Sequence, residues 1–235
     1  MCANRRFWSE TSGAPGRIFL FAVVVTAMSV LPGLSFADDE EVRRRWIGPG
    51  PSKPAEDPAG PRRHFRAKDP AALGDDDTAR IYGELKARLA QSYRRSGDPT
   101  AMAYQDWERY NTAPYRSAAH GNRFINNYAN GAAKAYGRYE EAGRMPVGAV
   151  VAKDSFTVTG DGAITAGPLF VMEKMPTGFN YVSGDWRYTM VQPDGTLFGV
   201  TKGEGSERVE FCIGCHLAVE DQDHLHFIPE EHRRR

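Results

Sequence analysis

The spacing of apolar residues changes near residue 146, and this change divides the chain into two zones. Before it, apolar residues recur every fourth position and predict a helix that begins near Asp77 and ends at Gly97-Asp98-Pro99. The stripe consists of Ile81, Leu85, Leu89 and Tyr93. Asp76 or Asp77 can cap this helix. Further helices are expected at 102–110 and 131–141, with their aromatic residues in the core; these are Tyr104, Trp107, Tyr136 and Tyr139.

After Pro146 the sequence is typical of β-structure. Short segments rich in valine, threonine and aromatic residues predict strands at 149–158, 169–175, 186–192 and 196–200. Gly160-Asp161-Gly162 and Pro193-Asp194-Gly195 provide turns between strands. Short strands at this spacing favour an antiparallel sheet. The expected fold class is therefore α+β, with a mainly antiparallel sheet and flanking helices.

The N-terminal part predicts export rather than folded structure. Residues 1–37 combine Arg5, Arg6 and Arg17 with an apolar stretch and a final Ser35-Phe36-Ala37, which is typical of a secretory signal peptide. An uncleaved N-terminal anchor is the alternative. Residues 38–75 are rich in proline, glycine and charge and predict a disordered linker. The domain is then expected at 76–235, in the periplasm or another extracytoplasmic space.

Composition narrows the range of partners. The 235 residues contain 30 Lys and Arg and 30 Asp and Glu, so the formal net charge is zero. No basic region dominates, which argues against a nucleic-acid-binding protein.

A motif near the C-terminus carries the most specific chemistry. Cys212, Cys215 and His216 form Cys-x-x-Cys-His, the attachment motif of c-type haem. Two thiols one helical turn apart can bond the two vinyl groups of one haem, and the adjacent histidine can ligate the iron. The sequence therefore predicts one covalent haem c with His216 as the proximal metal ligand.

Alternative interpretations of the motif stay open from the residues alone. The two cysteines can form a tight disulfide or a redox pair, or bind zinc together with His224 and His226. If haem binds, the sixth iron position is either open or filled by a methionine. Four methionines are available for it: Met145, Met172, Met175 and Met190.

Residues 103–230 resemble the cytochrome P-460 family of monohaem c-type proteins. The resemblance rests on segments in a fixed order, which are Tyr104-Gln105-Asp106-Trp107, His120-Gly121-Asn122-Arg123 with Asn130, Pro146 to Lys153, Gly184 to Tyr188, and Cys-x-x-Cys-His with Asp223. It implies a largely antiparallel β protein, often a homodimer, with five-coordinate haem. The namesakes oxidise hydroxylamine and carry a lysine bonded to a haem meso carbon. The related cytochromes c-prime-beta bind nitric oxide instead.

The resemblance implies roles for three further residues. Lys153 matches the cross-linking lysine, and Arg123 matches a distal-pocket arginine. Glu220 is the best match for a distal acidic residue, with Asp221 and Asp223 as rivals. From the residues alone, Lys153 is equally a strand lysine that reaches solvent, and Arg123 equally pairs with a carboxylate or a haem propionate.

Three functions remain open at this point. The first is conversion of hydroxylamine or a nitrogen oxide, with electrons passing to a soluble redox partner. The second is capture or sensing of nitric oxide without turnover, and the third is electron transfer with methionine ligation.

Overall fold

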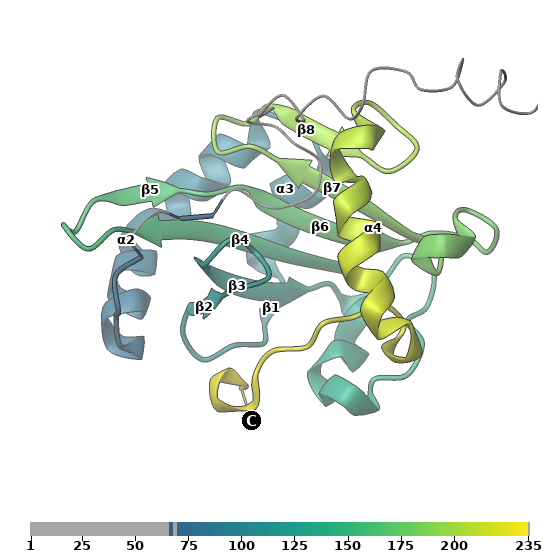
Figure 1. The fold of residues 1–235 in the computed structure, drawn as a ribbon, viewed down its shortest axis with the longest axis horizontal. Helices are drawn as coiled ribbons and strands as arrows, with labels where there is room; N and C mark the ends of the chain where they lie inside the picture. Colours follow the sequence, from purple (N-terminus) through teal and green to yellow (C-terminus); the bar gives the residue numbers. More distant parts are fainter. Residues whose placement is uncertain (1–65, 68–69, 235) are drawn as a thin grey trace, which may run out of the picture. The chain divides into compact units, whose positions relative to one another are not determined.

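The computed structural model describes residues 66–67 and 70–234, and the predicted signal peptide lies outside them (Figure 1). The described residues form an eight-stranded antiparallel sheet with the path β1-β3-β4-β6-β7-β8, while β2 pairs with β3 and β5 with β4. The strands are β1 (Glu108–Arg109), β2 (Tyr115–Ser117), β3 (Arg123–Ala129), β4 (Val150–Val158), β5 (Ile164–Ala166), β6 (Leu169–Lys174), β7 (Trp186–Val191) and β8 (Leu197–Val200). The α+β prediction is confirmed.

Helices pack on both faces of this sheet. The α-helices are α2 (Asp75–Arg94), α3 (Pro99–Ala103) and α4 (Glu210–His216). Short 3-10 helices complete the described part: η1 (Tyr104–Asp106), η2 (Gly131–Glu141), η3 (Tyr181–Ser183), η4 (Ser206–Val209), η5 (Leu217–Gln222) and η6 (Glu230–His232). The apolar stripe of α2 packs on one face of the sheet, and α4 packs on the other. No helix in the described part is long and apolar enough to cross a membrane.

Strand β4 is the central strand and separates two cores. Its side chains alternate, so that Val151 belongs to the core under α4 and Ala152 to the core under α2. Lys153 pairs with Asn127 on β3 and with Phe170 on β6. Nearly every β4 residue is buried, which fits a strand covered on both faces.

A buried carboxylate organises the core under α2. Asp154 accepts hydrogen bonds from Tyr82 (2.7 Å), Tyr104 (3.1 Å) and Asn126 (3.0 Å), which come from α2, η1 and β3. Its side chain is fully buried, and this burial raises the pKa of Asp154. Because buried polar groups are costly unless hydrogen-bonded, these three donors fix the elements around β4.

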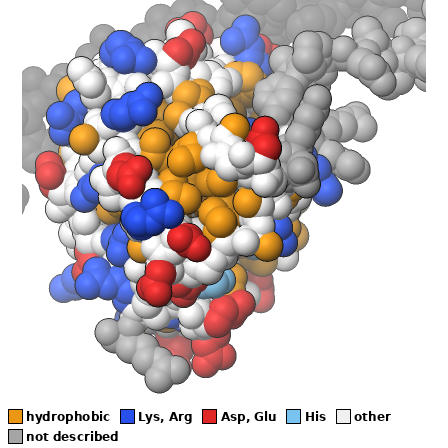
Figure 2. All heavy atoms as spheres, turned by 90° about the vertical axis from the view of Figure 1, so that its left-hand side faces the viewer, with side chains coloured by type: hydrophobic (Ala, Val, Ile, Leu, Met, Phe, Trp, Pro, Cys, Tyr) orange, Lys and Arg blue, Asp and Glu red, His pale blue; other side chains and the backbone are white. Residues whose placement is uncertain are grey.

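Figure 2 shows a separate apolar patch, ringed by charged residues, on the side of the molecule where α2 and β5 lie. A shallow hollow between these two elements is lined by Leu85, Leu89, Ile164 and Ala166 together with polar side chains of α2.

The predicted strands at 149–158, 169–175, 186–192 and 196–200 match β4, β6, β7 and β8 to within one residue at each end. The predicted helices differ more from the structure. The predicted helix 102–110 is wrong, since Asp98 caps a shorter helix at Pro99 and the chain is extended from Trp107. The segment 131–141 has the expected bounds but forms a 3-10 helix with a kink at Tyr139. Gly74, rather than Asp76 or Asp77, is the N-cap of α2.

The end of the predicted linker is part of the folded domain. Ala67 donates its backbone N–H to the carbonyl of Gly121 (2.8 Å), and Ala71 donates to that of Val158 (2.8 Å). Ala71 and Leu73 also pack against the core under α2. The boundary expected at residue 75 therefore lies too far along the chain, while residues 38–65 lie outside the described part.

This boundary predicts the effect of truncation. A chain in which the signal segment is joined directly to Asp76 should be less stable than one joined to Arg66. The loss of the backbone hydrogen bonds of Ala67 and Ala71, of the bond from Thr78 to the N-cap Gly74, and of some apolar contact should lower the free energy of unfolding by about 1–3 kcal/mol. Urea unfolding of the two haem-loaded proteins measures the difference, and equal midpoints would contradict the proposed boundary.

Candidate haem site

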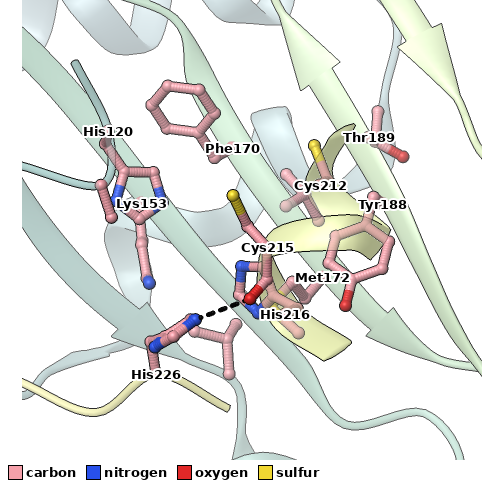
Figure 3. A pocket seen from close by; sticks show the side chains of 13 residues that line it. His120, Lys153, Phe170, Met172, Tyr188, Thr189, Cys212, Cys215, His216 and His226 are labelled. Carbon is pink, nitrogen blue, oxygen red and sulfur yellow. Dashed lines mark hydrogen bonds between the residues drawn. The ribbon is translucent and has the colours of Figure 1, made fainter. Parts of the chain in front are cut away.

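A cavity lies between the sheet and α4 (Figure 3). Its volume is about 550 Å³, open solvent at its mouth included. Side chains from β4, β6, β7 and α4 line it, together with residues of two loops. The lining residues are Ala119, His120, Val151, Lys153, Phe170, Val171, Met172, Tyr188, Thr189, Cys212, Cys215, His216 and His226. The predicted haem motif and the predicted lysine thus meet in one cavity.

Helix α4 carries the motif on the cavity wall. Its seven residues place Cys212 and Cys215 about one turn apart. Cys212 is buried, Cys215 is exposed, and both are free thiols rather than a disulfide. Burial raises the pKa of the Cys212 thiol to about 12.

His216 has a fixed tautomer. Its Nδ1 lies 2.7 Å from the backbone carbonyl of His224. A carbonyl can only accept, so Nδ1 donates and carries the proton, which puts the ring lone pair on Nε2. This second hydrogen bond is the usual support of a histidine that ligates a metal.

Lys153 lies inside the cavity and does not reach solvent. Only 5% of its surface is exposed, in the middle of the central strand. Burial lowers the pKa of Lys153 to about 8. Since an ordinary lysine has a pKa near 10.4, roughly 200-fold more of this amine is neutral at pH 7.

Two histidines and a tyrosine complete the polar part of the lining. His120 Nδ1 lies 2.9 Å from Ser117 Oγ, and His226 donates from Nε2 to the Cys215 carbonyl (3.2 Å). The Tyr188 hydroxyl is buried and has no hydrogen-bond partner among the described residues. The sequence indicates His226 only as a possible zinc ligand and gives Tyr188 no role in the site. Strand alternation predicts which β4 residues share the sheet face of Lys153. It does not predict that Tyr188 lies on this face, because that depends on the pairing of β7 with β6.

The other predicted catalytic residues do not line the cavity. Arg123 donates from Nη1 to the backbone carbonyl of the lining residue His120 (3.2 Å), so it contacts the cavity wall without lining the cavity. Burial lowers the pKa of Arg123. Glu220 and its rival Asp221 are exposed on η5. Asp223 is buried, but it pairs with Lys174.

The zinc alternative receives no geometric support in the described residues. Within residues 66–67 and 70–234, no three His, Cys, Asp or Glu side chains converge to hold a metal ion. The ring of His224 packs against Gly184 instead of facing the cysteines. Of the four methionines considered as iron ligands, only Met172 lines the cavity.

The residues present fit a haem. Two free thiols flank a cavity with mostly apolar walls, and the neighbouring histidine holds its lone pair on Nε2. The orphaned Tyr188 hydroxyl would be satisfied by a polar edge such as a haem propionate. A Cys-x-x-Cys-His motif with these properties is the haem attachment site that defines the class of c-type cytochromes.

Comparison with known proteins gives the family. The family model Cytochrome P460 matches residues 101–227, more than half of the chain. The chain therefore belongs to the cytochrome P460 family and is a c-type haem protein. A comparison with curated proteins found no match.

The site predicts how haem is held. In denaturing electrophoresis, haem stain should stay on the chain, because thioether bonds survive unfolding. Cys215→Ala should weaken this retention, while His216→Ala should keep the stain and change the absorption spectrum. Cys2→Ala is the matched control, since Cys2 lies in the predicted signal peptide. Loss of all stain from the unmodified protein would exclude covalent attachment.

Proposed function

We propose that this protein is exported and binds one haem c covalently through Cys212 and Cys215, with His216 as the proximal ligand. We further propose that it acts on hydroxylamine or nitric oxide at an open iron site. Electrons would pass to a soluble redox partner in the periplasm or another extracytoplasmic space. The signal-like segment at 1–37 and the haem motif support this proposal.

The observation that carries the proposal is the position of Lys153. A buried amine on a rigid central strand faces the same cavity as the haem motif. Only a neutral amine can bond to carbon, and the pKa of about 8 makes a substantial neutral fraction available at neutral pH. A lysine kept buried without a carboxylate partner is costly, which favours a role for it in the site.

Bound haem would supply the redox-active iron, and the protein would supply positioning and proton transfer. His216 would hold the iron from the α4 side. His120 and His226 are the rings on the cavity wall that can accept protons from a substrate. Burial lowers the pKa of His226, so its ring is mainly neutral at pH 7 and able to act as a base.

A second candidate function is nitric oxide capture without turnover. No aspartate or glutamate is among the described residues that line the cavity. Nitric oxide needs no proton acceptor to bind, whereas oxidation of hydroxylamine would have to use a histidine in place of a carboxylate base. The predicted catalytic role of Glu220 would require its exposed side chain to reach the cavity by a movement of η5.

Lys153 provides the test that separates these functions. Mass spectrometry of the digested holoprotein should find one haem peptide that joins the Lys153 fragment to the Cys212–Cys215 fragment. Lys153→Met should abolish this joint fragment and lower hydroxylamine oxidation by roughly 100-fold, a typical loss when a reacting group is misplaced. Lys153→Arg should do the same, because a guanidinium stays charged.

The exposed Lys134 on η2 provides a control, and Lys134→Met should change neither result. Separate fragments in the unmodified protein, with an unchanged spectrum in Lys153→Met, would rule out the cross-link. Nitric oxide capture would then be the better-supported function.

A further inference from the structure

A buried ion pair lies next to the site but does not line the cavity. Lys174 Nζ is 2.5 Å from Asp223 Oδ1, and the two side chains are 8% and 2% exposed. Lys174 ends β6, while Asp223 directly follows η5, seven positions after His216. The pair therefore ties the loop that follows the haem motif to the sheet.

Two further hydrogen bonds hold the same loop, and a third fixes Lys174. Asp223 Oδ2 accepts from the backbone N–H of Met145 (2.8 Å), and the Asp223 carbonyl accepts from Trp186 Nε1 (2.7 Å). Lys174 Nζ also donates to the carbonyl of Gly184 (2.8 Å). Arg144 is 3.9 Å from the same carboxylate, but its side chain is 85% exposed and adds little.

These contacts hold the backbone in an unusual conformation. Asp223 and His224 both have positive φ, 53° and 61°, which is uncommon for residues other than glycine. Such residues persist where the surrounding structure determines them. Gly184 takes part in this, since a Cβ there would lie 2.4 Å from the His224 ring.

The conformation of this turn sets the direction of the His224 backbone carbonyl. The His224 carbonyl accepts the Nδ1 proton of His216 at 2.7 Å. We propose that Lys174 and Asp223 are positioning residues that set the iron-binding strength of His216 through the His224 carbonyl. They act by fixing the turn on which the hydrogen-bond acceptor of His216 lies.

The physical reason is the basicity of the imidazole. A firm hydrogen bond from Nδ1 makes the ring a stronger donor to a metal through Nε2. A stronger donor stabilises the oxidised iron and lowers the reduction potential. The inference rests on haem ligation by His216, but it does not depend on which nitrogen compound the protein converts.

The test uses Lys174→Met and Asp223→Asn in the haem-loaded protein. The ferrous iron–histidine stretching band should shift to lower wavenumber in resonance Raman spectra, and the reduction potential should rise. Ferrous nitric oxide complexes should contain a larger five-coordinate fraction, because a weakened histidine leaves the iron more readily. Haem staining of each variant tests covalent attachment separately from these measurements. A protein without bound haem would contradict the proposed function, whereas a haem-bearing variant with unchanged spectra would contradict only the inference about the ion pair.

Two variants guard against a simple folding defect. The double variant Lys174→Met/Asp223→Asn buries no unpaired charge and should show the same three shifts if a single variant fails to accumulate. Gly184→Ala leaves both charges in place but displaces the His224 ring, and it should shift the band in the same direction.

A neighbouring ion pair supplies the control. Glu173 and Arg187 pair across β6 and β7 next to Lys174 and are partly exposed. Glu173→Gln should leave the band and the potential unchanged. An unchanged band and potential in folded, haem-bearing Lys174 and Asp223 variants would overturn the inference, and so would an equal shift in Glu173→Gln.

Discussion

The register of β4 is the constraint on which both the fold and the site depend. Two ionisable residues follow each other on this strand and point to opposite faces of the sheet, Lys153 toward the cavity and Asp154 toward the tyrosines under α2. A slip by one residue would exchange them, placing a lysine against three hydrogen-bond donors and a carboxylate in the haem cavity. Removing a buried hydrogen-bond partner costs about 1–3 kcal/mol for each group left unsatisfied, so the alternative register is strongly disfavoured. The polar network under α2 thus fixes the position of Lys153 without touching the cavity.

The opposite wall of the cavity is positioned by different means. Helix α4 has seven residues, too few to be stable through its own hydrogen bonds. It depends on apolar contacts with the sheet and on the anchored turn at Asp223 and His224. One wall is therefore a continuous strand with a fixed pairing, and the other is a short helix held at its C-terminal end by a buried ion pair. The distance between Lys153 and His216 therefore depends on both the pairing of β4 in the sheet and the packing of α4 against that sheet.

The parts of the structure that the sequence predicted are those controlled by local chemistry. The later strands follow from runs of β-branched and aromatic residues, and the thiols and His216 follow from the spacing of one motif. The sequence does not predict β3, because Asn126 and Asn127 break its apolar pattern. Both side chains are fully buried, and each is hydrogen-bonded to another segment: Asn126 accepts from Asn111, and Asn127 donates to Tyr136. The burial of Lys153 and the separation of Glu220 from the cavity depend on strand pairing and on the path of the chain after α4. Neither the burial of Lys153 nor the position of Glu220 can be predicted from neighbouring residues in the sequence. The role of Lys153 came from the resemblance to a family, because the residue pattern alone left it open.

The composition of the cavity wall restricts the chemistry that the site can perform. Its ionisable side chains, apart from the haem motif, are Lys153, His120, His226 and Tyr188, and no carboxylate of the described residues joins them. In the proposed function, a nitrogen of Lys153 that is bonded to the haem is no longer an ordinary base. Proton removal from a substrate would then fall to the two histidines, of which His120 is already paired with Ser117 and His226 with the Cys215 carbonyl. The ring of His226 has a second nitrogen, so it can still exchange a proton while its first hydrogen bond holds it in place. A cross-linked lysine and a histidine base are therefore compatible, whereas one lysine could not serve both purposes.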